Sequence, residues 1–443
     1  MDEKRLLDTR AAIPLVAGAM LGVGIFLVPT QIAPYMPSAS VMYCVWGMVG
    51  FFCWTGALCY AELGTRFPRT GGDVVYLREL YGNTIANIMG WVIFSGIFTG
   101  SIAALAVPLC TFQLPVIMDA FTTINWDDRF LGVPARSMVA CAVVLCFTGL
   151  NILGLRISTF LQALLTFVPM GVYALVAFGA LFIEGASDPP ALHNNSVSLS
   201  WEGIAVAISG CYFAFSGWNQ AGYVAGELHR PERTLPLTVT ISVLSITALY
   251  LLLNMAFVHQ LGFSYLQELG FAEVGTLTAQ RIGGAKWGWW MNLLILLGLA
   301  GSLNGTILCG ARVAYSMAKE GGLGHWFAQY SQRHQPVRVL ILQAVIAMGY
   351  ILSGTFDQLL ELVSLAMMVV AVVTAAGVWR FDRGEGEVYL APRLAPYVFV
   401  LGGATLCAIM IYHTIVEQNW PALIGLGILA VTLMMSKFLP FNR

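Results

Sequence analysis

Twelve apolar stretches of membrane-spanning length divide this chain and constrain its fold more than any other feature. A helix needs about 20 mainly apolar residues to cross the hydrocarbon layer of a bilayer. The 443 residues are 58% hydrophobic and only 10% charged, whereas soluble domains carry about 25% charged residues. Lipid must therefore replace water around most of the chain, and we predict an all-α polytopic membrane protein with 12 transmembrane helices. The predicted spans are 12–33, 41–62, 84–112, 137–155, 158–184, 201–226, 236–258, 287–316, 337–353, 358–379, 395–415 and 420–438.

The basic residues fall mainly in alternate loops, which predicts the orientation of the chain. With the N-terminus inside, the connections on the cytoplasmic side hold most lysines and arginines, as the positive-inside rule requires. Outside lie only Arg129, Arg136, Arg281 and Lys286, while Arg312 is near the inner end of the eighth stretch. The charged residues 1–10 precede no cleavage-site pattern, so the first span is expected to be a retained anchor. We predict a multi-pass protein of the cell (inner or plasma) membrane with both termini cytoplasmic.

Two of the stretches contain runs that disfavour a continuous helix. The first stretch holds Gly18, Gly22 and Gly24, and the sixth holds Ser216-Gly217 within an aromatic cluster. Glycines alone also serve close helix packing, which is the alternative interpretation of the first run. Breaks at corresponding places in two halves of a chain instead indicate a substrate site near the middle of the membrane.

The positions of the breaks predict how the spans are organised. The first and sixth spans are five apart, which fits two five-helix units of opposite topology followed by two further helices. We expect the first unit in residues 1–184, the second in 185–393 and the last two helices in 394–443.

The backbone groups freed by the breaks suit a zwitterionic ligand. Helix N-termini favour anions and C-termini favour cations. Amides around Val23 and Gly24 are expected to hold a carboxylate, and the carbonyl near Met20 to accept from an ammonium group. The sixth stretch adds bulky, small and polar side chains, the mixture that a closable pocket needs.

Several spaced motifs occur in order over roughly residues 10–393. They are Gly22-Val-Gly-Ile-Phe26 with Pro29, Tyr60-Ala-Glu-Leu63 with Pro68 and Gly71-Gly72, Phe213 to Asn219, Glu227 with Pro231 and Pro236, and Gly301-Ser-Leu-Asn-Gly305 with Arg312 and Lys319-Glu-Gly-Gly-Leu323. With these motifs the chain resembles the amino acid–polyamine–organocation superfamily, and within it the L-type amino acid transporter branch.

This resemblance implies a five-plus-five inverted-repeat fold with broken helices 1 and 6, alternating access, and amino acids as substrates. It implies that Phe213 closes the pocket from outside and that Trp218 and Asn219 shape its side-chain end. The substrate-binding residues it implies are Met20, Gly22, Val23, Gly24, Phe213, Ala214, Ser216, Gly217, Trp218 and Asn219.

The sequence departs from this family pattern at two positions. Val23 stands where many relatives have serine or threonine, so the amides alone would hold the carboxylate. Pro169 stands seven residues after Gln162, where many relatives carry a lysine in place of sodium.

The coupling mode has more than one interpretation. No Asp, Glu, Lys or His lies near the middle of a predicted span, and Glu62, Glu227 and Arg312 lie at inner ends, where they suit a gate or an anchoring salt bridge. We rank exchange of neutral L-amino acids first. The alternatives are a proton- or sodium-coupled amino acid symporter, with Ser302 and Thr306 as the candidate ion site, and a carrier of cationic amino acids or amines.

Other classes of protein lack their expected residues. The nine cysteines form no CxxC pair and the six histidines do not cluster, so we expect no metal site, no cofactor and no enzyme activity. A net charge of −1 gives no indication of nucleic-acid binding. Residues 113–136 contain no cysteine, so we expect no disulfide-linked heavy chain. Ser216 in place of glycine favours a small or medium neutral substrate.

Overall fold

We describe residues 7–119, 126, 128–130, 132–185, 200–270, 272–353, 356–381 and 394–416 in a computed structural model of the chain. The side chains of 202, 356–362, 364 and 413–416 are outside this description, and so is the twelfth predicted stretch, 420–438.

Within the described residues, each of the first eleven predicted stretches is helical. In chain order they are α1 (Thr9–Met20) with α2 (Gly24–Ile32); α3 (Ala39–Arg66); α5 (Asn83–Trp91), η2 (Val92–Phe98), α6 (Thr99–Pro108), η3 (Leu109–Gln113) and α7 (Leu114–Met118) as one continuous span; α8 (Ala135–Ile152); α9 (Leu155–Ala180); α10 (Trp201–Ala214) with α11 (Gln220–Tyr223); α12 (Pro231–Leu261); α15 (Ala285–Lys319); α16 (Val337–Ser353); α17 (Phe356–Ala376) with η6 (Gly377–Arg380); and α18 (Ala395–Val416).

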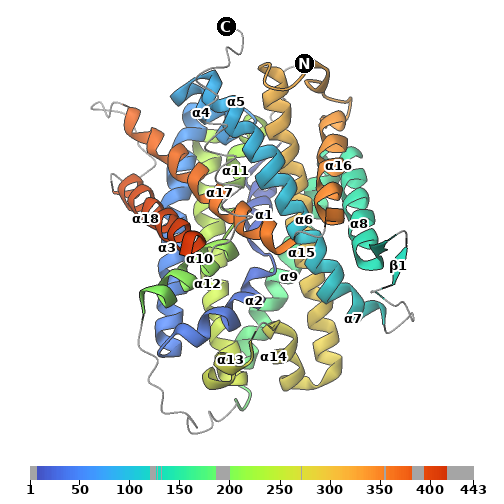
Figure 1. The fold of residues 1–443 in the computed structure, drawn as a ribbon, viewed down its shortest axis with the longest axis vertical. Coiled ribbons are helices and arrows are strands. Elements are labelled where there is room, and N and C mark those ends of the chain that lie inside the picture. The colour runs from blue at the N-terminus through green and yellow to red at the C-terminus, as the bar shows by residue number, and fades with distance from the viewer. Residues whose placement is uncertain are drawn as a thin grey trace.

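The loops contain elements that hydropathy alone does not predict. Helix α4 (Asp73–Tyr81) lies at one end of the molecule, and α13 (Phe263–Glu268) and α14 (Val274–Gly283) lie at the opposite end (Figure 1). Short 3₁₀ turns are η1 (Ala33–Tyr35), η4 (Ala225–Glu227) and η5 (His325–Phe327). The two-residue strands β1 (Arg129–Phe130) and β2 (Val133–Pro134) form a small antiparallel hairpin.

Side-chain caps fix the beginnings of several spans. Asp8 accepts from the Ala11 amide at 3.0 Å, Ser38 from Val41 at 3.4 Å and Ser200 from Gly203 at 3.0 Å. Each cap satisfies one of the amides that a helix start leaves without an intrahelical acceptor. Hydropathy sets the span itself, and the polar cap sets where it begins.

Helix α1 lies at the centre of the bundle, against α9, α12 and α15. All its residues from Pro14 to Met20 are buried. The outer face of α9 instead exposes Phe160 and Leu175, and the turn after it Phe182, by about three quarters of their surface, which suits contact with lipid. The predicted fold class, an all-α polytopic membrane protein whose first and sixth spans are broken, is confirmed. The division of the chain at 184 and 393 stays a prediction.

Candidate functional site

The first span is interrupted where its glycines predict. Helix α1 ends at Met20, the Gly22 amide donates back to the Met20 carbonyl at 2.7 Å, and α2 begins at Gly24. The first amides of α2, including those of Gly24 and Ile25, consequently have no acceptor within the helix. This break can present amides to an anion.

The sixth span is interrupted at the matching place. Helix α10 ends at Ala214, a turn follows, and α11 begins at Gln220. Gly217 has φ +103°, and a Cβ built there would lie 2.6 Å from the Ala19 Cβ. A side chain at this position would therefore be both strained and in contact with the first span.

The two breaks pack directly against each other. A Cβ on Gly24 would lie 2.7 Å from the Ala214 Cα, so only glycine permits this approach. The glycines thus serve two purposes, since they interrupt the helices and also let the interrupted segments touch.

A tyrosine that the sequence did not single out caps both broken helices. Tyr250 of α12 is fully buried, and its hydroxyl lies 2.5 Å from the Met20 carbonyl and 3.1 Å from the Ala214 carbonyl. These carbonyls are at the C-terminal ends of α1 and α10, where no intrahelical donor remains. In the sequence Tyr250 is one aromatic residue in an apolar span, which reads as ordinary packing.

A cavity of about 80 Å³ lies between the two breaks. It is lined further by side chains of η2, α6 and α17, by Thr306 of α15 and by Asp73 of α4. The structure brings all the predicted substrate-binding residues to its wall: Met20, Gly22, Val23, Gly24, Phe213, Ala214, Ser216, Gly217, Trp218 and Asn219. Their roles toward a ligand stay predictions.

The residues of the cavity wall differ in how many of their hydrogen-bonding groups are already used and in how tightly their rings are packed. The Met20 carbonyl already accepts from Tyr250 and from the Gly22 amide, so the predicted ammonium contact would compete with two donors. The Trp218 ring is buried and packs edge-on against Tyr60, with 5.0 Å between ring centroids. Phe213 is half-buried, whereas Trp218 cannot leave its place without displacing neighbouring rings.

The two residues of the candidate ion site hold backbone carbonyls. The Ser302 hydroxyl donates to the Gly18 carbonyl at 2.6 Å, and the Thr306 hydroxyl to the Ser302 carbonyl at 2.8 Å. Both side chains are buried. Ser302 joins α15 to the end of α1, whereas the Thr306 bond lies within α15, and the binding of a cation by the two residues stays a prediction. Among the described residues, no cluster of three or more His, Cys, Asp or Glu could hold a metal ion.

A neutral polar network lies beside Pro169, where relatives were expected to carry a lysine. The Gln162 amide donates to the Pro14 carbonyl at 3.2 Å and accepts from Asn304 at 2.8 Å. The Thr166 hydroxyl also donates to the Pro14 carbonyl, at 3.0 Å. These buried amides and hydroxyls connect α9, α1 and α15 without any charge.

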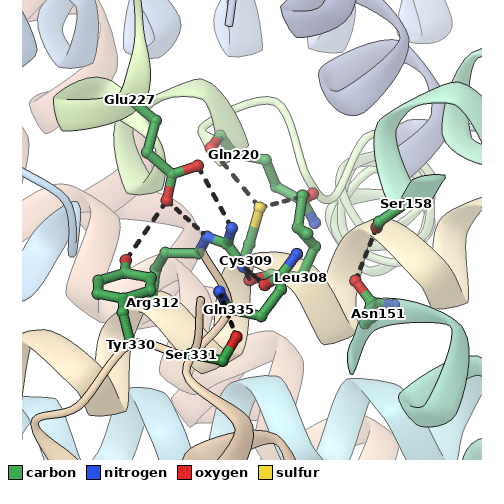
Figure 2. Close-up of polar contacts among 10 residues, drawn as sticks. All are labelled: Asn151, Ser158, Gln220, Glu227, Leu308, Cys309, Arg312, Tyr330, Ser331 and Gln335. Carbon is green, nitrogen blue, oxygen red and sulfur yellow. Dashed lines mark hydrogen bonds and ion pairs between the residues drawn. The ribbon is translucent and has the colours of Figure 1, made fainter. Parts of the chain in front are cut away.

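A buried ion pair links α15 to η4, at the end of the sixth span (Figure 2). The Arg312 guanidinium donates to both carboxylate oxygens of Glu227, at 3.1 and 3.3 Å, and to Gln335 at 3.0 Å. Arg312 has no exposed surface, and Tyr330 lies 3.5 Å from the same carboxylate. Glu62 instead pairs within α3 with Arg66, at 3.2 Å. Whether either pair acts as a gate or as an anchor stays a prediction.

Asp73 is the second functional candidate that the sequence interpretation missed. It begins α4 directly after Gly71-Gly72, has no exposed surface, and accepts hydrogen bonds from the hydroxyls of Tyr60 and Tyr223. Burial raises the pKa of this carboxyl, and the two tyrosine hydrogen bonds oppose that rise. Asp73 lies in a loop of the sequence, so a search of the predicted spans for charged residues passes over it.

Comparisons with known proteins place these features in a family context. Residues 7–435 match the family model described as amino acid permease. The chain is 27% identical over 386 residues to the human b(0,+)-type amino acid transporter 1, covering 85% of this chain and 76% of that protein. It is 26% identical over 400 residues to the serine/threonine exchanger SteT of Bacillus subtilis (88% and 86%), and 25% identical over 384 residues to the human large neutral amino acids transporter small subunit 2 (84% and 69%).

Proposed function

The chain belongs to the amino acid permease family, and we propose on that premise that it exchanges small neutral L-amino acids across the cell membrane by alternating access. One observation carries the proposal: two interrupted spans face one cavity with unpaired helix-start amides and with carbonyls. A zwitterion matches both kinds of group.

The size of the cavity supports a small ligand. A volume of about 80 Å³ holds roughly six water molecules, which is comparable with the number of heavy atoms in alanine or serine. Ser216 and Asn219 are the polar side chains that the sixth span adds to its wall. Asp73 is the acidic residue at the wall, and both its oxygens are already hydrogen-bonded to tyrosines, which argues against cationic side chains.

Exchange without an ion follows from the neutrality of the membrane-embedded network. Gln162, Thr166 and Asn304 supply hydrogen bonds where a titratable group would otherwise couple transport to protons. The buried pair Arg312–Glu227 then closes one side while the cavity loads from the other. Proton symport is the second candidate, because Asp73 is a buried carboxyl at the cavity wall.

The cysteines bear on whether the carrier has a covalent partner, and the basic loops bear on its orientation in the membrane. All nine cysteines are free thiols, and none lies in residues 113–136, so we infer that the carrier works without a disulfide-linked heavy chain. The distribution of lysine and arginine supports a cytoplasmic position for both termini.

Counterflow in proteoliposomes tests the proposal. Vesicles loaded with unlabelled alanine or serine are expected to accelerate uptake of the labelled amino acid without a sodium or pH gradient. Acceleration that requires a pH gradient favours symport, and no acceleration with any of the twenty amino acids contradicts both. Matched liposomes without protein give the background.

A further inference from the structure

A chain of hydrogen bonds joins the cavity wall to a buried carboxylate. The Asn219 side-chain amide donates to the Tyr223 hydroxyl at 3.3 Å, and that hydroxyl donates to Asp73 Oδ2. The second carboxylate oxygen, Oδ1, accepts from Tyr60. The chain thus runs from the end of the sixth span, through α11, to the first residue of α4.

The charge of Asp73 determines the direction of every hydrogen bond in this chain. An ionised carboxylate has no hydrogen, so both tyrosines must donate to it. The Tyr223 oxygen can then only accept, and Asn219 must approach it with its NH₂ group. Asn219 lines the cavity, and its carbonyl oxygen is the polar atom that remains for a ligand.

Protonation reverses this order. A proton taken from water onto Asp73 Oδ2 makes the carboxyl the donor to Tyr223. The Tyr223 hydrogen is released from the carboxyl and can be donated to Asn219, provided that the amide turns its carbonyl toward the tyrosine. The NH₂ group of Asn219 then faces the cavity. No bond other than O–H changes, and the only species gained is the proton.

The groups around Asp73 permit such a change. Tyr60 faces the carboxyl from α3, Tyr223 from α11 and Tyr76 from α4 itself. Helix α17 contributes the hydroxyl of Thr374, and α10 contributes Tyr212. Among the described residues no charged side chain acts on this carboxyl. Burial therefore raises the pKa of this carboxyl, and only hydrogen bonds oppose that rise.

We propose that Asp73 is a proton-binding positioning residue whose charge state decides which end of the Asn219 amide a bound amino acid meets. The inference rests on the proposed function, because it takes the ligand to be an amino acid in this cavity. With Asp73 ionised the site favours hydrogen-bond donors such as the serine hydroxyl. With Asp73 protonated it favours hydrogen-bond acceptors, which include the serine hydroxyl and also an ether oxygen that cannot donate.

Equilibrium binding to the purified full-length protein tests this without requiring transport. Labelled alanine is displaced by two isosteric pairs, serine against 2-aminobutyrate and O-methylserine against norvaline, at about pH 5 and about pH 8.5. From high to low pH we expect the preference for O-methylserine over norvaline to rise about fivefold, the worth of one hydrogen bond between neutral groups. The preference for serine over 2-aminobutyrate should change little, because a hydroxyl can donate to the Asn219 carbonyl or accept from its NH₂ group.

Two matched variants separate positioning from structural support. Tyr223→Phe breaks the chain between Asp73 and Asn219, so the preference for O-methylserine over norvaline is expected to become independent of pH. Tyr60→Phe removes one donor to Asp73 but keeps the chain, so the pH dependence is expected to remain, with its midpoint at higher pH. A purely structural role would weaken all four ligands equally at both pH values.

The outcomes are distinct. An O-methylserine-to-norvaline ratio in the unmodified protein that does not change between the two pH values overturns the inference, and this holds even where Tyr223→Phe does not fold. Pronounced pH dependence that survives in Tyr223→Phe also overturns it. Intact, pH-dependent binding without any counterflow would refute the proposed exchange and leave the role of Asp73 standing.

Discussion

Neutralising Glu227 tests whether the buried pair with Arg312 holds one side of the carrier closed. The pair joins η4, at the end of the sixth span, to α15, and Arg312 has no exposed surface. Glu227→Gln keeps the shape of the side chain but leaves the guanidinium buried without a counter-charge. Breaking one partner of such a pair costs about 3–5 kcal/mol.

That magnitude predicts a large shift in conformation. Movement of the sixth span away from α15 must separate the pair, so the loss destabilises the closed arrangement alone. At about 1.4 kcal/mol per factor of ten, a loss of about 3 kcal/mol lowers the ratio of closed to open conformations about a hundredfold. A buried residue one turn from Arg312 should therefore become accessible.

Cys309 is a native reporter for this opening. It is buried one turn before Arg312, with its sulfur 3.5 Å from Gln220 Oε1. We expect a membrane-impermeant maleimide, applied from the side that this pair closes, to label Cys309 much faster in Glu227→Gln, as measured by peptide mass spectrometry. Mass spectrometry separates this site from the exposed Cys44 and Cys146.

Two further variants complete the experiment. Glu79→Gln breaks the largely exposed pair with Arg69 and should change labelling little, because such pairs contribute about 1 kcal/mol or less. Glu227→Gln combined with Arg312→Met removes both charges and should restore most of the protection. Equal labelling of Cys309 in Glu227→Gln and in the unmodified protein would refute the reasoning.

Three other predictions concern the breaks and the buried carboxyl. Gly217→Ala places a Cβ at positive φ and against Ala19, so we expect a loss of more than about 1 kcal/mol and weaker alanine binding, whereas Gly171→Ala, with open space around it, should bind normally. Tyr250→Phe removes the hydroxyl hydrogen that lies between the Met20 and Ala214 carbonyls, which should cost about 1–3 kcal/mol and lower the Tm in detergent; an unchanged Tm would contradict the capping role. Burial raises the pKa of Asp73 in the folded protein above that in the unfolded chain, so its stabilising contribution is present at acid pH and is lost as pH rises through the folded pKa. As pH rises from the unfolded pKa of Asp73 to its folded pKa, the Tm of the unmodified protein should therefore fall relative to that of Asp73→Asn. Parallel pH profiles of the two Tm values would exclude this contribution of Asp73.

Local features of the chain were enough to predict its spans and their interruptions. Hydropathy located the first eleven spans because the solvent requirement of a membrane helix acts on each segment separately. The breaks at Gly22 and Gly217 were equally readable, since backbone freedom belongs to the glycine itself. Helices α4, α13 and α14 were missed because they are amphipathic elements in loops, which carry no span-length apolar signal.

The sequence by itself therefore determined a bundle of apolar helices with two openings in the backbone, because hydropathy and glycine act locally. Only the tertiary structure decided which polar groups form hydrogen bonds at those interruptions and around them. Tyr250 reaches the Met20 carbonyl from 230 residues away, Tyr223 reaches Asp73 across 150, and Arg312 reaches Glu227 across 85. Each of these contacts joins groups that have no local reason to meet, and the packing of the helices selects them because a buried polar group must find a partner.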